Sequence, residues 1–252
     1  MYAAFASVYD SLMADVDYAS WARHYAGLMK LCGVRGGKVC ECACGTGSLT
    51  IPLCQLGYQM TGVDMSADML FEAAQKARKA GAMIPFVKQD MRYMHLHRQM
   101  DAVLCTCDGV NYLRNQQELL SFFSAAYATL REGGALIFDV STPYKLRHLL
   151  GDNFIGDERE DVAYLWKNRW NEKHQSVKMQ LSIFTRVEGD SYRRVEEEQT
   201  QFAYEARALE DALLQVGFAN VKLFGGLRMT APQERDERWH VCAVKPLLTP
   251  GE

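Results

Sequence analysis

Two glycines in a short turn have the clearest potential for chemistry in this chain. Gly45 and Gly47 follow an apolar stretch that begins at Val39, and this order predicts a strand, a tight turn and a helix. At the carboxyl end of a parallel strand, such a turn lets a flat, polar small molecule approach the backbone closely. The sequence therefore predicts a ligand-binding turn over residues 39–47.

A carboxylate follows the second predicted strand. Residues 58–63 read as a strand that ends at Asp64. This position is about 20 residues beyond the glycines, which suits a carboxylate that accepts both hydroxyls of a ribose. The alternative is that Asp64 caps the next helix, but Ser66 is better placed for that role. We therefore predict that Asp64 binds a ribose.

A second carboxylate follows the third predicted strand. Residues 84–88 lead into Asp90 and Met91. An acceptor beside an apolar side chain suits adenine, which offers an exocyclic amine and a ring face. A plain surface turn is the alternative. Together with the glycine turn, these residues predict a site for a ligand that carries a nucleoside.

The glycine turn disfavours a nicotinamide dinucleotide. A dinucleotide fingerprint anchored on Gly45 and Gly47 needs a third glycine at position 50, where Thr50 stands. The Tyr-x-x-x-Lys pair of short-chain oxidoreductases is also absent near residue 150, since Tyr144 and Lys145 are adjacent. A different nucleoside cofactor is therefore favoured.

Several stretches resemble motifs of the class I S-adenosylmethionine (SAM) dependent methyltransferases of the small-molecule type. The first motif is an acidic residue followed by Ala/Gly-x-Gly-x-Gly, which corresponds here to Glu41, Ala43, Gly45 and Gly47. Residues 62–70 resemble the second motif, residues 90–92 resemble the adenine motif, and residues 130–139 resemble the step into the fifth strand. The resemblance implies a methyltransferase with SAM as its cofactor.

The resemblance also implies further cofactor contacts. The opening of the chain is similar to a lid segment whose tyrosines close over SAM, and the segment after the fourth strand faces the methionine part of SAM in this family. Cys107 is expected to act through its backbone. The cofactor-binding residues predicted in this way are Tyr2, Tyr9, Glu41, Ala43, Gly45, Gly47, Asp64, Met65, Asp90, Met91 and Cys107.

Few residues in the sequence indicate where the methyl acceptor binds. Methyl transfer from a sulfonium is an in-line displacement that needs alignment, exclusion of water and at most one base. We predict that Tyr112, His148 and Trp166 shape the acceptor pocket, and we assign no catalytic residue. Asn111 has two interpretations: it acts on an amine substrate, as in other family members, or it caps the helix that starts near Gln116.

The pattern of the chain predicts an α/β fold. Strand and helix alternate five times over residues 39–140, which favours a doubly wound, mostly parallel sheet. The resemblance implies seven strands in this Rossmann-like sheet, the last two in an antiparallel hairpin. We predict that residues 1–150 and 205–252 form this core with an N-terminal helical lid. The loop 225–238 is expected to help line the pocket.

Residues 151–204 interrupt the alternation of strands and helices. Three segments alternate with a period of two, which predicts an inserted antiparallel meander with one apolar and one wet face. The turn at residues 188–191 is a good hairpin turn. We interpret the insertion as a specificity lid, with a sheet that pairs two protomers as the alternative, and Glu196, Glu197 and Glu198 as a solvated face.

The composition limits the kinds of substrate and ligand that are expected. A net charge of −3 and 23% charged residues give no electrostatic footprint for nucleic acid, so we predict a small-molecule methyl acceptor. An RNA or protein methyltransferase and a non-catalytic SAM-binding protein remain the alternatives. The eight cysteines lack zinc-knuckle spacing and are expected to be reduced, without a metal. We expect a cytoplasmic monomer or homodimer without membrane association, because no basic leader or long apolar run is visible.

Overall fold

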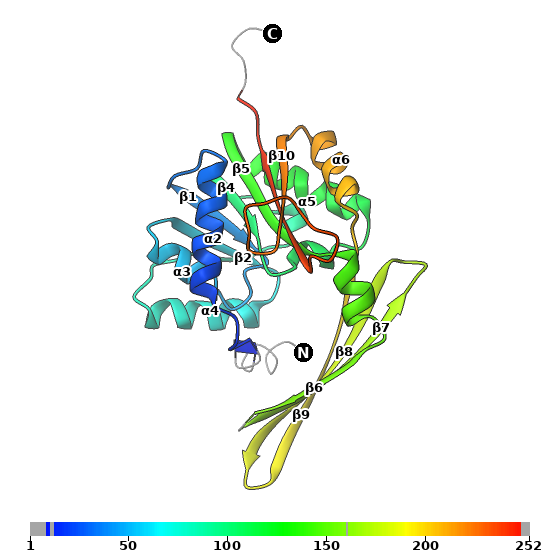
Figure 1. The fold of residues 1–252 in the computed structure, drawn as a ribbon. Coiled ribbons are helices and arrows are strands. Elements are labelled where there is room, and N and C mark those ends of the chain that lie inside the picture. Colours follow the sequence, from blue (N-terminus) through cyan, green and yellow to red (C-terminus); the bar gives the residue numbers. More distant parts are fainter. Residues whose placement is uncertain (1–8, 11–12, 160, 248–252) are drawn as a thin grey trace.

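Seven strands form the central sheet of the protein. The structure is a computed structural model that describes residues 9–10, 13–159 and 161–247 (Figure 1). The strand order is β10-β11-β5-β4-β1-β2-β3. The bounds are β1 Lys38–Cys42, β2 Gln59–Asp64, β3 Phe86–Lys88, β4 Met100–Cys105, β5 Leu130–Ser141, β10 Ala219–Gly225 and β11 Arg238–Val244. Strands β1 to β5 pair in parallel, and β11 runs antiparallel to both β5 and β10, which confirms the predicted sheet.

Helices cover both faces of this sheet. Their bounds are α2 Tyr18–Leu31, α3 Thr50–Gln55, α4 Ala67–Lys79, α5 Gln116–Thr129 and α6 Ala206–Val216. One apolar cluster packs α2 and α3 against one face, and another packs α5 and α6 against the other. Because both faces are covered, the parallel strands are apolar along nearly their whole length, as in β4. Because these apolar runs are continuous, the parallel strands could be predicted from the sequence.

The structure corrects the interpretation of Asn111 as a helix cap. Helix α5 begins after Asn115, whose side chain accepts a hydrogen bond from the Glu118 backbone N–H. The buried Asn111 amide instead donates to the carbonyl oxygens of Ser141 and Phe202, at 3.1 and 2.9 Å, and accepts from the Ser141 N–H at 2.8 Å. Asn111 therefore joins the end of β5 to the end of the inserted segment.

The inserted segment is a four-stranded antiparallel sheet, one strand more than predicted. Its strands are β6 Phe154–Glu158, β7 Val162–Asn171, β8 Ser176–Glu188 and β9 Ser191–Phe202, paired in that order. The additional strand, β6, lies at the edge, and most of its side chains are exposed. An exposed edge strand carries no apolar alternation, so β6 could not be predicted from the sequence. The turn between β8 and β9 lies within the predicted hairpin.

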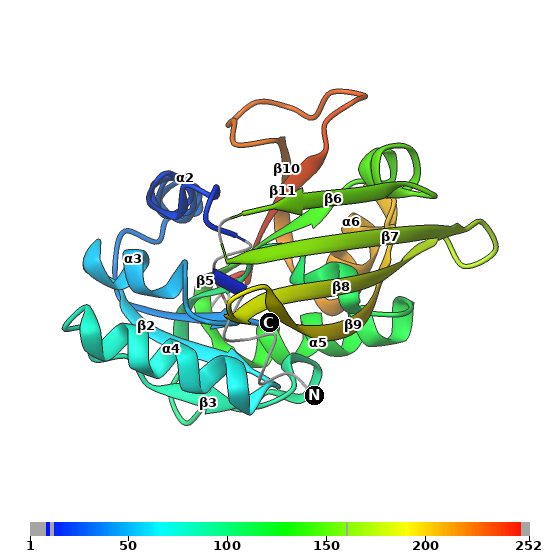
Figure 2. The ribbon, with the colours of Figure 1, turned by 90° about the horizontal axis from the view of Figure 1, so that it is seen from below.

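The inserted sheet packs against the core at two places. At one, Val162 and Ile183 pack with Met69 of α4 and with Tyr9. At the other, Val177 and Met179 pack on Leu146 of the short helix η3, Lys145–Leu150. In Figure 1 and Figure 2 the sheet extends across one end of the core. The apolar face of the insertion is therefore turned toward the core.

The loop between β10 and β11 does not line the cavity described below, which corrects the prediction for residues 225–238. It lies against α2, because a β-carbon added at Gly27 would stand 2.3 Å from the Met229 methyl. Asp236 braces the loop by accepting from the Arg228 guanidinium at 2.6 Å. In the described part of the chain, no helix has the length and apolarity needed to cross a membrane.

Candidate active site

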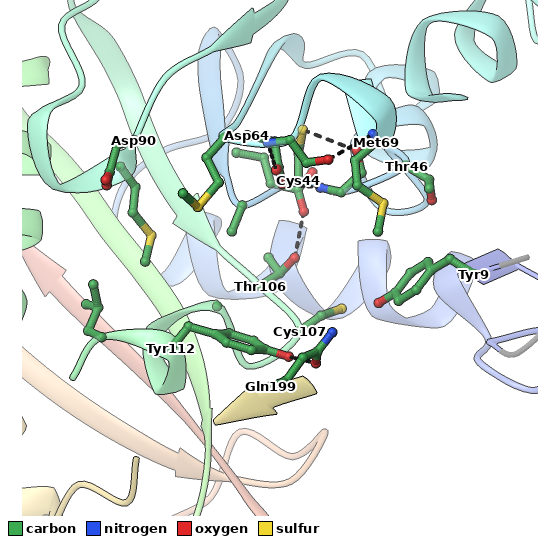
Figure 3. Close-up of a pocket in the computed structure, with 18 of the residues that line it drawn as sticks. Tyr9, Cys44, Thr46, Asp64, Met69, Asp90, Thr106, Cys107, Tyr112 and Gln199 are labelled. Atoms are coloured by element: carbon green, nitrogen blue, oxygen red, sulfur yellow. Dashed lines mark hydrogen bonds between the residues drawn. The ribbon is translucent and has the colours of Figure 1, made fainter. Parts of the chain in front are cut away.

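A cavity of about 490 Å³ lies at the carboxyl ends of the parallel strands (Figure 3). This is the edge where ligands bind in open α/β sheets. The structure brings ten of the predicted residues to its wall: Tyr9, Glu41, Ala43, Gly45, Asp64, Met65, Asp90, Met91, Cys107 and Tyr112. Tyr2 lies outside the described residues.

The two glycines of the turn serve different purposes. Gly45 has a φ of +53°, and a β-carbon there would meet no atom within 4 Å, so its backbone faces open space at the cavity. Gly47 has a φ of +73° and does not line the cavity; a β-carbon there would stand 3.2 Å from that of Ala73. Gly45 thus leaves room for a ligand, and Gly47 allows α4 to pack closely.

Asp64 stands at the tip of β2 and is held by backbone donors. One carboxylate oxygen accepts from the Gly45 N–H at 2.8 Å and the other from the Ser66 N–H at 2.9 Å. Each oxygen keeps a lone pair for a ligand hydroxyl. Burial raises the pKa of Asp64, and the backbone hydrogen bonds oppose that shift. The Ser66 hydroxyl accepts from the Met69 N–H and caps α4, as predicted.

Glu41 is fully buried in β1. Its carboxylate accepts hydrogen bonds from the hydroxyls of Thr50 and Thr106, the latter at 2.6 Å. Burial raises the pKa of Glu41 to about 7, while both hydroxyls act in the opposite direction. Glu41 therefore links the helix after the turn to the end of β4. The hydroxyl at position 50 has a structural use here that a glycine would not provide.

Asp90 is tied to a neighbouring cation. Both of its carboxylate oxygens accept from the Arg92 guanidinium, which also pairs with Glu118 at 2.6 Å. The hydrogen bonds from Arg92 lower the pKa of Asp90, so the carboxylate is ionised and fixed in position. The sequence did not indicate this pairing. An adenine amine at Asp90 would share these oxygens with Arg92, whose backbone N–H and guanidinium together make four hydrogen bonds to them.

The N-terminal side of the cavity is tied to the glycine turn. Asp10 accepts from the Lys76 ammonium at 2.6 Å and from the Thr46 hydroxyl at 2.7 Å. Lys76 also donates to the Ser48 hydroxyl at 2.7 Å. These bonds hold Tyr9, the residue before Asp10, beside α4 and the cavity. Sequence reasoning missed this cluster because its members lie up to 66 positions apart.

The loop after β4 is held in an unusual backbone conformation. Cys107 and Asp108 have φ values of +53° and +66°, a region that side chains rarely adopt. The buried carboxylate of Asp139 accepts from both of their N–H groups, at 2.8 and 3.0 Å, and it also pairs with Arg238 and the Tyr25 hydroxyl. Burial raises the pKa of the Cys107 thiol, so the thiol stays protonated. The backbone of this loop therefore borders the cavity at Cys107.

The inserted sheet supplies another wall of the cavity. The Tyr112 hydroxyl donates to Gln199 Oε1 at 2.7 Å, and both side chains border the cavity (Figure 3). Glu198 and Thr200 of β9 also line it. Sequence reasoning missed these β9 residues because the strand is mostly polar and shows little alternation. The pairing with Tyr112 bridges the core and the insertion.

Two residues predicted for the acceptor side do not line the cavity. His148 is exposed on η3. Trp166 packs against the cluster formed by Leu146, Val177 and Met179. In the part of the chain that the structure describes, no three His, Cys, Asp or Glu side chains form a group that could hold a metal ion. All eight cysteines are free.

Comparison with known proteins identifies the family. Residues 39–134 match the methyltransferase domain family. The chain is 31% identical over 246 residues to the candidate methyltransferase YqeM of Bacillus subtilis (strain 168), a match covering 97% of each protein. A SAM-dependent methyltransferase from Clostridium acetobutylicum ATCC 824 is 31% identical, with a TM-score of 0.88 over 98% of this chain and 99% of that one.

The fold also matches that of a methyltransferase solved with its cofactor. SAM-bound CalS10, an amino pentose methyltransferase from Micromonospora echinaspora, is 18% identical, with a TM-score of 0.76 over 94% of this chain and 96% of that one. At the cavity, an open glycine turn, an anchored carboxylate and a second carboxylate lie on adjacent strand ends. The chain belongs to the class I SAM-dependent methyltransferases, and SAM is its cofactor.

Proposed function

We propose that this enzyme transfers the methyl group of SAM to a small molecule held between the glycine turn and the inserted sheet. The observation that carries the proposal is the cavity itself, which Asp64 borders on the core side and Gln199 on the side of the insertion. Its volume of about 490 Å³ lies in the usual range for small-molecule sites. A net charge of −3 speaks against a nucleic-acid substrate.

The cofactor half of the site is assigned as follows. Asp64 would bind the ribose hydroxyls, Asp90 and Met91 the adenine, and the backbone near Gly45 and Cys107 the methionine part. Tyr9 and Met65 would lie along the bound cofactor, while Glu41, Ala43 and Gly47 shape the turn. When bound, SAM would supply an activated methyl group that passes in line to a lone pair of the acceptor, with the thioether sulfur of S-adenosylhomocysteine as the leaving group.

The chain itself contributes positioning and exclusion of water. We propose that residues 1–150 and 205–252 act as the cofactor-binding core and that residues 151–204 act as a lid carrying the acceptor wall. The alternative of a dimerisation sheet is less favoured, because the apolar face of the insertion already packs on Tyr9, Met69 and Leu146. Aligning two bound molecules in a shielded site accounts for much of the rate of such transfers.

Binding of SAM tests the cofactor half. We expect calorimetry to give a Kd for SAM and S-adenosylhomocysteine that rises about 10-fold or more in Asp64→Ala, since the variant loses hydrogen bonds made by a charged group. Asp68→Ala, on the neighbouring helix α4, is the matched control and should bind normally. Unchanged binding in Asp64→Ala would remove the ribose assignment.

Transfer of a tritiated methyl group separates the candidate activities. The assay offers small amines, sugars, carboxylates, tRNA and a protein mixture to the enzyme. Label in a small-molecule fraction supports the proposal. Label in tRNA or protein contradicts it, and binding of SAM without any transfer would favour a non-catalytic SAM-binding protein.

A further inference from the structure

Asp139 is a fully buried carboxylate near the end of β5, and the proposed function gives it no role. One of its oxygens accepts from the Tyr25 hydroxyl and from the Cys107 N–H, at 2.8 Å for Cys107. The other accepts from the Arg238 guanidinium and from the Asp108 N–H, at 3.0 Å for Asp108. A carboxylate has about four acceptor positions, so these donors occupy them all and fix the side chain in place.

Asp139 holds the peptide group between Cys107 and Asp108 by its nitrogen. The N–H and C=O bonds of a planar trans peptide point in opposite directions. Because the Asp108 N–H points at the Asp139 carboxylate, the Cys107 carbonyl oxygen of the same peptide group points away from it. Cys107 borders the cavity and Asp139 does not (Figure 3). The carbonyl therefore lies on the side of the loop away from the buried carboxylate.

The Cys107 carbonyl oxygen is available to a ligand. The carbonyl oxygen of Thr106 accepts from the Gly109 N–H at 3.3 Å, and that of Asp108 accepts from the Asn111 N–H at 2.9 Å. In the part of the chain that the structure describes, no donor bonds to the carbonyl oxygen of Cys107, which lies between them. Since polar groups that are shielded from water usually have partners, this oxygen is a candidate acceptor for a bound molecule.

The carboxylate also makes this carbonyl a stronger acceptor. A hydrogen bond from a peptide N–H to a charged carboxylate polarises the peptide group and increases the negative charge on its oxygen. Arg238 keeps the arrangement rigid, because it also pairs with the Asp108 carboxylate at 2.6 Å, and its guanidinium carbon lies 5.0 Å from the centroid of the Trp21 ring. The positive φ values of Cys107 and Asp108 are thus maintained by their surroundings.

We infer that Asp139 is a positioning residue for the cofactor: it directs and polarises the Cys107 carbonyl oxygen, which accepts a hydrogen bond from the ammonium group of the methionine part of SAM. The inference rests on the proposed function, which assigns this part of SAM to the backbone near Cys107. An ammonium group is a charged donor, so it gains most from a carbonyl with increased negative charge. Asp139 acts only through the peptide group, since it does not border the cavity.

Calorimetry of the full-length enzyme with three ligands tests the inference. All three carry the adenosyl group and the sulfur. S-adenosylhomocysteine has the amine and the carboxylate of the methionine part, decarboxylated SAM has the amine alone, and 5′-methylthioadenosine has neither. Asp139→Asn removes the charge behind the peptide group. It should raise the Kd of S-adenosylhomocysteine and of decarboxylated SAM by roughly 10-fold and leave that of 5′-methylthioadenosine unchanged.

Asp101→Asn is the matched control. The Asp101 carboxylate accepts from the Lys38 N–H at 2.8 Å and pairs with Arg131 at 2.6 Å, so the same two kinds of interaction are weakened. Asp101 lies at the start of β4, whereas the cavity lies at the carboxyl ends of the strands. This variant should bind all three ligands as the wild type does.

The other outcomes of the calorimetry are equally clear. If Asp139→Asn weakens all three ligands equally, Asp139 has a general structural role and the inference is wrong. It is also wrong if no ligand is weakened, or if only S-adenosylhomocysteine is, because the carboxylate of the ligand would then be the group affected. A wild-type enzyme that does not bind S-adenosylhomocysteine would instead refute the proposed function.

NMR of the wild type provides a second test, which does not depend on the folding of Asp139→Asn. When the Cys107 carbonyl oxygen accepts from a charged donor, the hydrogen bond from the Asp108 amide to Asp139 strengthens. The Asp108 amide proton should therefore move downfield with S-adenosylhomocysteine and with decarboxylated SAM, but not with 5′-methylthioadenosine. The same response to all three ligands, or no response to any of them, would contradict the inference.

Discussion

At the scale of single residues, Asp139 determines the conformation of the loop after β4. Its buried carboxylate accepts hydrogen bonds from the N–H groups of Cys107 and Asp108 and forms an ion pair with Arg238. Asp139→Asn removes one of the two carboxylates that pair with the buried Arg238 guanidinium, while Asp108 remains, so we expect the free energy of unfolding to fall by about 1–3 kcal/mol. Urea unfolding measures this change.

The matched comparison for this substitution is Asp157→Asn, which breaks a partly exposed ion pair with Arg159. Exposed pairs are worth about 1 kcal/mol or less, so this variant should unfold like the wild type. If both variants lose the same free energy of unfolding, the buried ion pair of Asp139 stabilises the protein no more than an exposed ion pair does.

His240 gives the protein a pH-dependent stability. It is fully buried beside His24, and burial lowers its pKa to about 4. The unfolded chain binds the proton first, at a pKa of about 6.5. The contribution of neutral His240 is therefore complete above pH 6.5 and is lost as the pH falls toward 4, by about 3 kcal/mol.

This effect is measured as the difference in unfolding free energy between the wild type and His240→Phe, determined by urea at pH 7 and at pH 4.5. The difference should move in favour of the variant at the lower pH. His174→Phe, at an exposed position in the turn between β7 and β8, is the control and should not alter the pH dependence. A constant difference for His240→Phe would mean that His240 has the same pKa in the native and unfolded states.

At the scale of elements, we expect the two glycines of the turn between β1 and α3 to differ in role, Gly45 in SAM binding and Gly47 in stability. Both glycines have positive φ, so an alanine at either position is strained by about 1–2 kcal/mol. Gly47→Ala adds a close contact with Ala73 and should lower the Tm further than Gly45→Ala. Gly45→Ala places a methyl group in the cavity and should weaken SAM binding more.

Thermal unfolding and calorimetry of the two variants test this separation. The prediction is a crossed result, with the larger loss of Tm at position 47 and the larger loss of affinity at position 45. Equal losses of both quantities at the two positions would show that the turn acts only as a structural unit.

The elements that the sequence predicted correctly are those whose burial leaves a local pattern. Strands β1 to β5 are apolar because helices cover both faces, and the position of Asp64 follows once β2 is located. Strand β6 could not be found, since an exposed edge strand has no such pattern. Glu197 is only 7% exposed, which corrects the interpretation of residues 196–198 as a solvated face. Its buried position was hidden for a related reason: β9 is polar on both faces, and only its pairing with Leu181 reveals which face is covered.

At the scale of the whole molecule, the site depends on contacts between distant parts of the chain. Asn111 bonds to Phe202 across 91 positions, and Arg238 pairs with Asp108 across 130. Spacing rules act over one turn, one strand or one βαβ unit, so contacts of this length lie beyond them. The cavity-lining residues at the ends of the parallel strands were predictable because successive strand ends meet at one edge of the sheet. The cavity residues of β9 were not predictable, because another sheet supplies them.

The most direct test of the account is a crystal structure of the enzyme with S-adenosylhomocysteine. We predict ribose hydroxyls within hydrogen-bond distance of Asp64, adenine beside Asp90 and Met91, and the sulfur directed toward the space bordered by Tyr112 and Gln199. An adenosyl group bound elsewhere, or a sulfur directed away from the inserted sheet, would contradict the account.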